Sequence, residues 1–135
     1  MSVFQSAILK KLQSDSSITA LVGTRVYPGI APEGVTDPFI TVNAYGPINA
    51  DLTYGATISD LSGRFLVRAT ALDSSPSTVS TINAAIRTSL HNASLTITGM
   101  TALACLLNNI VEAYPEEDEG RLFWHEGSIF EVMAT

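Results

Sequence analysis

Residues 62–90 read SGRFLVRATALDSSPSTVSTINAAIRTSL, and they decide the fold class because a strand pattern here runs directly into a helix pattern. In the first half, Phe65 and Val67 alternate with Arg64 and Arg68. This period of two is typical of a strand that has one buried and one strongly polar face. We therefore expect a strand over residues 62–71.

A helix is predicted immediately after this strand. Ser75 is placed to cap it, and Pro76 occupies the first helical position, where a missing amide hydrogen costs nothing. Asn92 is a suitable stop for the helix. Apolar residues at helical spacing form the stripe that is expected to face the core: Val79, Ile82, Ile86 and Leu90.

The beginning of the chain carries a second helical pattern. Ser2 and Gln5 have the spacing of a capping box, in which each side chain satisfies a free amide of the first turn. Residues 15–22 predict a further short helical turn, which Gly23 ends. Apolar residues recur at four-residue spacing along the first helix: Phe4, Ile8 and Leu12.

The segment between this helical region and residue 62 contains turns and a first strand. Residues 24–38 should be extended and stiff, because proline fixes its own backbone and disfavours helix before it. A strand is expected over residues 39–45. Residues 48–60 have no strong period, and we interpret them as a long hairpin arm between two strands. Half of the six prolines of the chain lie in the stiff segment: Pro28, Pro32 and Pro38.

The end of the chain predicts a closing hairpin. Residues 103–113 and 122–133 are β segments, residues 114–120 form the loop between them, and residues 95–98 are a candidate short strand. Hairpins within an alternation of helices and strands favour helices packed on one face of an antiparallel sheet. We therefore expect a single α+β domain over residues 1–135, with an antiparallel sheet of about four strands, two main helices on one face, and the order α-β-β-α-β-β.

Composition restricts the partners of this domain. Hydrophobic residues make up 46% of the chain and charged residues only 15%, which favours self-association because a monomer hides so much apolar surface with difficulty. The formal net charge is −6, and only Lys10 and Lys11 are adjacent basic residues. Because nucleic-acid binding depends on a basic patch, we expect no specific DNA or RNA binding.

The single cysteine and the hydropathy of the sequence indicate the cellular compartment of the protein. The single cysteine, Cys105, lies in an apolar run, so we expect a buried, reduced thiol and no intrachain disulfide. No signal peptide pattern is present in residues 1–11, and no apolar run approaches the roughly 20 residues that span a bilayer. We expect a soluble protein that is made in a cytoplasm and has no membrane partner.

No motif for catalysis, metal binding or cofactor binding is recognisable. The two histidines, His91 and His125, have no metal-ligand spacing, and no serine lies in a G-x-S-x-G motif. The acidic run at residues 116–119 does not match a calcium loop, so a solvated hairpin tip or a charged contact with a partner is favoured. We expect a protein that is not an enzyme and needs no cofactor or metal.

One stretch resembles a known family. Residues 18–27, ITALVGTRVY, lead into an Ala31-Pro32-Glu33-Gly34 loop and then into Pro38-Phe39-Ile40. This pattern resembles the tail-terminator, or tail-completion, proteins of long-tailed bacteriophages, in which a helical turn ends in Val-Gly and a Pro-aromatic-Ile sequence begins the first strand. The family also has a strand like Phe65-Leu66-Val67-Arg68, a following helix and a closing hairpin, so the likeness extends over nearly the whole chain.

The resemblance implies a structural protein of the virion that is assembled in the host cytoplasm. Such proteins resemble ring-forming subunits, typically hexameric, which cap the tail tube and join it to the connector proteins of the head. DNA passes through such a ring without being held. No cofactor and no catalytic residue is implied.

The loop chemistry predicts where such a ring makes its contacts. Prolines reduce the entropy that a loop loses when it docks, and the arm over residues 48–60 carries apolar groups that a lone subunit exposes. Tyrosines such as Tyr27, Tyr45 and Tyr54, together with Trp124, are interface anchors or half-buried core residues, and the sequence leaves both readings open. The expected interface residues are Arg25, Tyr27, Pro28, Pro32, Leu52, Tyr54 and Ile58.

Two other readings belong to different classes of protein. One is another neck or tail component, such as a head-completion protein or a tube subunit. The other is a small cytoplasmic ligand-binding domain, which requires a deep apolar pocket with convergent polar groups. A hydrolase is a remote third, and it requires a paired nucleophile and base in the fold.

Overall fold

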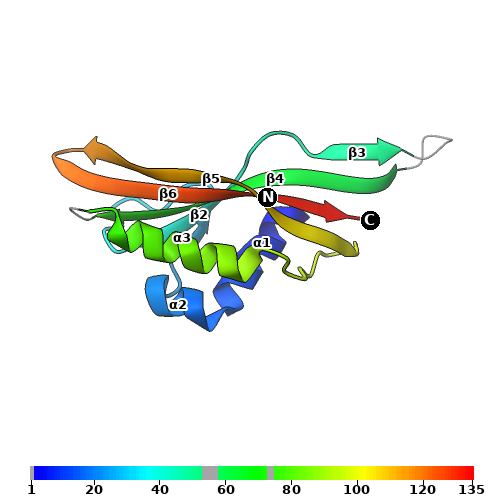
Figure 1. Cartoon of the computed structure of the whole chain (residues 1–135), viewed down its shortest axis with the longest axis horizontal. Coiled ribbons are helices and arrows are strands. Elements are labelled where there is room, and N and C mark those ends of the chain that lie inside the picture. Colours follow the sequence, from blue (N-terminus) through cyan, green and yellow to red (C-terminus); the bar gives the residue numbers. More distant parts are fainter. Residues whose placement is uncertain (1, 53–57, 73–74) are drawn as a thin grey trace.

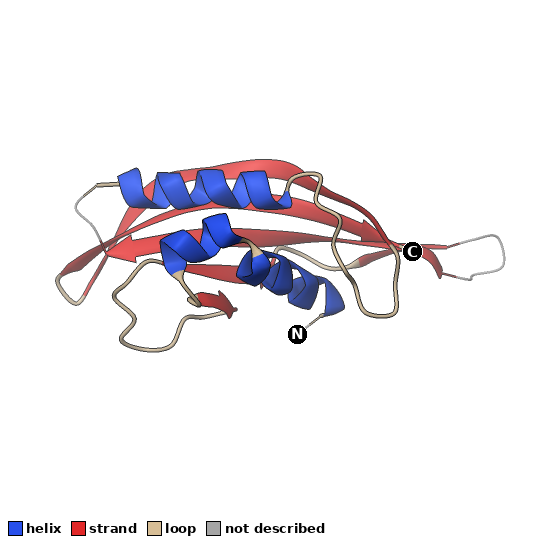
Figure 2. Cartoon of the chain, turned by 90° about the horizontal axis from the view of Figure 1, so that it is seen from below, coloured by secondary structure: helices blue, strands red, loops and turns tan. Residues whose placement is uncertain are grey.

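The computed structural model describes residues 2–52, 58–72 and 75–135. They form a curved sheet with three helices packed on one face (Figures 1 and 2). The elements in chain order are α1 (Val3–Ser14), α2 (Ser16–Val22), β1 (Val26–Pro28), β2 (Phe39–Ala44), β3 (Asn49–Leu52), β4 (Ile58–Leu72), α3 (Ser77–Leu90), β5 (Ala102–Asp118) and β6 (Arg121–Ala134). The α+β class is therefore confirmed, while the expected element order lacked α2, β1 and β3.

The sheet has the strand order β1-β2-β4-β6-β5, and β3 pairs with the beginning of β4. The expected count of about four strands was wrong, because six strands form. The two missed strands are short, with three residues in β1 and four in β3. Such lengths leave too few residues for a periodic pattern to be recognised. β1 pairs with β2 in parallel, so the sheet is mixed rather than purely antiparallel.

Helix α1 begins at a serine cap, as the sequence predicted. The backbone amide of Gln5 donates a hydrogen bond of 3.1 Å to Ser2 Oγ. The reciprocal bond of a capping box, from the Ser2 amide to Gln5 Oε1, is not seen among the described residues, and Gln5 Nε2 donates to the carbonyl oxygen of Val42 at 2.6 Å. The same glutamine therefore ties α1 to strand β2.

A second cap separates α1 from α2. Asp15 Oδ1 accepts hydrogen bonds from the amide and from the hydroxyl of Ser17, at 3.0 and 2.7 Å. These bonds favour the charged carboxylate and lower the pKa of Asp15, the hydroxyl of Ser17 being the largest cause. Gly23 ends α2 with a φ of 59°, a conformation that glycine adopts without strain.

The central strand β4 separates the two faces of the sheet. Phe65, Val67 and Ala69 are buried on the helix side, as their alternation predicted. Arg64 and Arg68 alternate with them and so belong to the opposite face, which none of the described helices covers (Figure 1). The strand is longer than expected because it runs from residue 58, where it pairs with β3, to residue 72.

Helix α3 carries the predicted core stripe. Its start differs from the expectation, because Pro76 occupies the cap position and no side chain caps the helix. The hydroxyl of Ser75 instead lies 3.0 Å from that of Ser77. The helix ends at Leu90, and Asn92 follows in a left-handed conformation with a φ of 61°. All four predicted stripe residues are buried: Val79, Ile82, Ile86 and Leu90.

The closing hairpin is longer and its turn tighter than the sequence indicated. β5 extends to Asp118 and β6 begins at Arg121, so the turn contains only Glu119 and Gly120. Both have positive φ, 51° and 78°, as two-residue hairpin turns require. Residues 95–98 are not a strand, although Leu95 and Ile97 are buried against the core.

Candidate functional site

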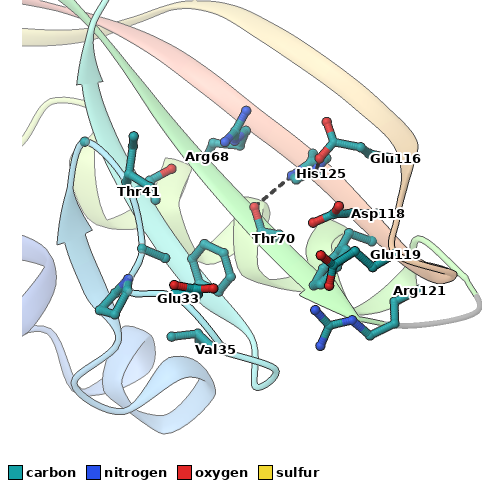
Figure 3. A pocket seen from close by; sticks show the side chains of 17 residues that line it. Glu33, Val35, Thr41, Arg68, Thr70, Glu116, Asp118, Glu119, Arg121 and His125 are labelled. Atoms are coloured by element: carbon teal, nitrogen blue, oxygen red, sulfur yellow. Dashed lines mark hydrogen bonds and ion pairs between the residues drawn. The ribbon is translucent and has the colours of Figure 1, made fainter.

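A pocket of about 450 Å³ lies on the helix-free face of the sheet, near the turn of the β5–β6 hairpin. Its floor consists of side chains from β2, β4 and β6, and its two walls come from distant parts of the chain (Figure 3). One wall is the loop over residues 29–35, and the other is the end of the hairpin. The pocket thus joins the proline-rich loop to the acidic run, two segments that the sequence analysis treated separately.

The floor follows from the strand register. Thr41 of β2 pairs with Arg68 of β4, and Thr70 of β4 pairs with His125 of β6. Because neighbouring strands present paired residues on the same face, these four side chains lie side by side. Thr41, Thr70 and His125 are 1%, 2% and 5% exposed, so the floor is buried although no helix covers it.

His125 is the central titratable group of the floor. Its Nδ1 lies 2.8 Å from Thr70 Oγ1, and its Nε2 lies 3.6 Å from Glu116 Oε1. Burial and, to a lesser extent, the nearby charge of Arg68 lower the pKa of His125, while Glu116 opposes this shift. The imidazole is therefore predominantly neutral at neutral pH.

The hairpin wall is strongly acidic. Glu116, Asp118 and Glu119 line it, and Glu33 faces them from the opposite loop (Figure 3). Arg121 also lines the pocket, where its guanidinium stacks over the ring of Phe123 at 5.6 Å from the centroid. Four carboxylates thus surround a pocket that contains two arginine side chains, Arg68 and Arg121.

The row of Thr70, His125 and Glu116 has the residue types of a hydrolase triad, which tests the remote enzymatic reading. The 3.6 Å between His125 and Glu116 exceeds the hydrogen-bond distance that orients a catalytic imidazole. The hydroxyl of Thr70 belongs to a side chain that is almost fully buried. The geometry therefore favours recognition of a partner group over nucleophilic catalysis.

Metal binding finds no support in the described part of the chain. No group of three or more His, Cys, Asp or Glu side chains converges there as metal ligands do. Cys105 is fully buried in the core, as expected, and burial raises the pKa of its thiol to about 11. Among the described helices, none combines the length and the apolar character that crossing a membrane requires.

A second candidate surface is the outer edge of β5, the last strand of the sheet. The strand is 17 residues long, and several of its large apolar side chains are exposed. Part of this edge is bonded to the segment after α3, since the amide of Asn92 donates to the carbonyl oxygen of Cys105 at 2.8 Å and the amide of Leu107 donates to His91 Nδ1 at 3.0 Å. The rest of the edge, with its apolar side chains, favours association with another chain. These exposed residues are Leu103, Leu106, Ile110 and Tyr114.

Four of the expected interface residues lie near the β1 edge of the sheet. Arg25 is half-buried, and its Nε donates a hydrogen bond of 2.8 Å to the carbonyl oxygen of Pro38, so it closes the loop over residues 29–38. Tyr27 is half-buried and packs against Phe39, with ring centroids 6.1 Å apart. Pro28 and Pro32 are exposed, and Pro32 lines the pocket.

The remaining three expected interface residues belong to the arm. Leu52 ends β3 and pairs in register with Ile58, the first residue of β4, while Tyr54 lies outside the described residues. This pairing shows that a hairpin arm forms, as predicted. The arm pairs with residues 58–62 of β4 whereas β2 pairs with residues 65–70, so the structure does not bring the two groups together.

Sequence reasoning missed the pocket floor. The alternation along β4 placed Arg68 on the polar face, and Thr70 follows with the same period. His125 lies on a neighbouring strand, but no sequence pattern states which strands are neighbours. The sequence therefore shows which face of a single strand each residue occupies, but it does not show which strands combine to form the site.

Comparison with known proteins gives one family. The family model described as tail completion protein gp17 matches residues 6–126 of the chain. No curated protein matches the chain in sequence.

Two solved structures share the fold. One is a chain of the virion of a native gene transfer agent particle, with a TM-score of 0.73 and 19% identity over 96% of this chain and 92% of that one. The other has a TM-score of 0.55 and 12% identity over 96% of this chain and 90% of its own. At these identities the likeness shows the fold alone.

Proposed function

Because this chain belongs to the family of tail completion protein gp17 and is a structural protein of the phage virion tail, we propose that it terminates the tail as a closed ring. In this role, identical subunits form a ring, typically of six, on the last layer of the tail tube. The ring stops tube growth and presents a surface to the connector proteins of the head. The family match over residues 6–126 is the observation that carries this proposal.

The fold supports assembly into a ring. A ring requires heterologous contacts, in which one patch of a subunit meets a different patch of the next subunit. The β3–β4 arm and the β5–β6 hairpin project at opposite ends of the sheet, so they offer two different contact devices (Figure 1). The exposed edge of β5 adds a third surface, and its apolar side chains become buried when another subunit covers them.

The expected interface residues fit this arrangement. Arg25 holds the 29–38 loop closed, and Pro28 and Pro32 stiffen it, so this loop loses little entropy when it docks. Tyr27 supports the loop from beneath through its contact with Phe39. The arm residues Leu52, Tyr54 and Ile58 are assigned to a separate contact of the proposed ring, because the arm pairs with a different part of β4 from β2.

The solved chain of similar fold belongs to a virion particle, which supports a place in an assembled tail or neck. Another neck or tail component is the nearest alternative, because such proteins also assemble from small α+β subunits. A free-standing ligand-binding domain is disfavoured, because the pocket on the helix-free face is open and rimmed by carboxylates rather than deep and apolar.

The test is deletion of the gene in the phage that encodes the protein, followed by electron microscopy of the particles. A terminator predicts filled heads without tails, together with tubes of uncontrolled length that do not join heads. Complementation by the wild-type gene restores joined particles and serves as the control. Normal infectious particles, or defects confined to the distal end of the tail, contradict the proposal.

A further inference from the structure

Three buried polar atoms of the pocket floor have no hydrogen-bond partner among the described residues. They are Thr41 Oγ1, Arg68 Nε and His125 Nε2. Buried polar atoms are nearly always hydrogen-bonded, because leaving one unpaired costs the full desolvation penalty. Three such atoms at the floor of one open pocket indicate that a polar group from outside completes the site.

The geometry at His125 defines what that group has to supply. His125 Nδ1 is paired with Thr70 Oγ1 at 2.8 Å, whereas Nε2 faces Glu116 Oε1 at 3.6 Å. At this distance no hydrogen bond joins the two groups, so the Glu116 carboxylate keeps acceptor capacity that faces the pocket. A guest with several N–H donors matches the acceptors on this side of the pocket, namely the Glu116 carboxylate and the unpaired hydroxyl of Thr41.

The charges around the pocket favour a cationic guest. Glu33, Glu116, Asp118 and Glu119 provide four carboxylates. Of the two arginines, Arg121 is stacked on Phe123, and Arg68 directs its Nη1 toward the hydroxyl of Tyr114 at 3.3 Å. Arg68 Nε is a donor that a cationic guest leaves unpaired, but the four carboxylates outnumber the two guanidinium groups, so the side chain of a lysine or arginine is the matching chemistry.

The same chain carries a complementary basic surface. Lys10 is exposed, Lys11 is half-buried, and together they are the only adjacent basic residues of the sequence. Both border a hollow of about 250 Å³ between α1 and residues 94–96. This surface belongs to the helical layer, whereas the pocket opens on the helix-free face of the sheet (Figures 2 and 3).

We infer that the acidic pocket of one subunit receives the α1 lysines, Lys10 and Lys11, of the neighbouring subunit. The inference rests on the proposed ring, because it places the helical layer of each subunit against the helix-free face of the next. Two different patches on opposite faces give the heterologous contact that a ring needs.

The experiment uses charge reversal in two matched variants of the full chain. The pocket variant is Glu116→Lys with Glu119→Lys, and the lysine variant is Lys10→Glu with Lys11→Glu. The control is Glu117→Lys, because Glu117 lies in the same acidic run but does not line the pocket. Circular dichroism and thermal melting verify that each variant folds.

Each variant is supplied in trans to the deletion phage, and joined particles are counted. We expect each of the two reversed variants to lower the yield by about tenfold or more, since like charges then face each other at every subunit contact. The Glu117→Lys control should complement like the wild type. Supplying both reversed variants together should restore the yield, because alternating subunits place opposite charges at each contact in a ring with an even number of subunits.

The outcomes separate this inference from the proposed function. A deletion without tail-joining defects contradicts the terminator role itself. If the deletion shows the defect but each reversed variant repairs it fully, only the pocket contact is overturned and the terminator role stands. If the pocket variant fails while the lysine variant complements, the cation belongs to a tube or connector protein, and the inference of a second copy is wrong. Failure of the mixture, with both variants folded, overturns it as well.

Discussion

Asn83 Oδ1 accepts a hydrogen bond of 2.7 Å from Ser128 Oγ, and both side chains are fully buried between α3 and β6. The amide nitrogen of Asn83 donates to Glu126 Oε2, also at 2.7 Å. Ser80 donates to the other oxygen of the same carboxylate at 2.9 Å. Helix α3 is therefore held on the sheet by a polar network as well as by its apolar stripe.

This network predicts an unequal response to two substitutions in α3. Asn83→Ala should lower the free energy of unfolding by about 3 kcal/mol, because it leaves the Ser128 hydroxyl buried and unpaired and removes a bond to a carboxylate. Ser80→Ala should cost about 1 kcal/mol, since it removes one half-buried hydrogen bond. Urea unfolding measures both, and equal losses would contradict the central role of Asn83.

The apolar stripe of α3 predicts a second pair of results. Ile86→Ala should destabilise the fold by about 3 kcal/mol, because Ile86 is fully buried and the substitution leaves a cavity. Ile30→Ala is the matched control, since Ile30 is 88% exposed, and it should change stability by less than about 0.5 kcal/mol. A small effect of Ile86→Ala in urea unfolding would show that α3 packs more loosely than the structure indicates.

The environment of His125 predicts how stability depends on pH. Burial and Arg68 lower the pKa of His125 in the folded state, so the unfolded state binds more protons as the pH falls below about 6.5. The contribution of the neutral imidazole is therefore fully present above this pH and is lost as the pH falls toward the folded-state pKa. Replacing the histidine by His125→Gln should flatten the slope of unfolding free energy against pH between about 5 and 7. Identical slopes for the variant and the wild type would falsify this assignment.

The burial of Cys105 predicts its reactivity. The thiol is fully buried with a pKa raised to about 11, so it stays protonated and shielded at neutral pH. A thiol reagent should label the native protein slowly and the urea-unfolded protein at the rate of a free cysteine. A Ser94→Cys variant is the control, because Ser94 is exposed and its thiol should react rapidly in the native state. Rapid labelling of native wild-type protein would contradict the buried position.

The charge of the chain predicts its behaviour toward DNA. With a formal net charge of −6 and no basic cluster larger than Lys10 and Lys11, the isolated protein should bind double-stranded DNA weakly at physiological salt. A filter-binding or mobility assay measures this, with affinity compared at low and high salt. Tight binding that weakens steeply with salt would contradict the prediction.

The elements that could be predicted from the sequence are those that repeat a period over several turns. The stripe from Val79 to Leu90 and the alternation at Phe65 and Val67 identified α3 and β4, because burial on one face leaves a regular apolar pattern. Strand β1 was missed, because it is three residues long and its parallel pairing with β2 is long-range. The cap at Ser75 was wrong, because the first turn of α3 begins one residue later than the Ser-Pro pattern suggested.

The pocket was beyond prediction for a different reason. Thr41, Thr70 and His125 come together only because β2, β4 and β6 are neighbours in the sheet. The acidic run was recognised as a charged tip that meets solvent or a partner, but its position opposite Glu33 depends on how the 29–35 loop folds over the sheet. Residue types can be read from a sequence, whereas convergence of distant strands is a property of the topology.

The register of β5 against β6 shifts at three places, between Ala102 and Ala104, between Leu107 and Asn109, and between Val111 and Tyr114. Such bulges twist an edge strand and interrupt the straight ladder on which a stray strand would otherwise grow. Flat apolar edges on free subunits would aggregate with one another. The irregular edge disfavours such growth on an unassembled subunit, so the bulges bear on when the protein associates as well as on where it does.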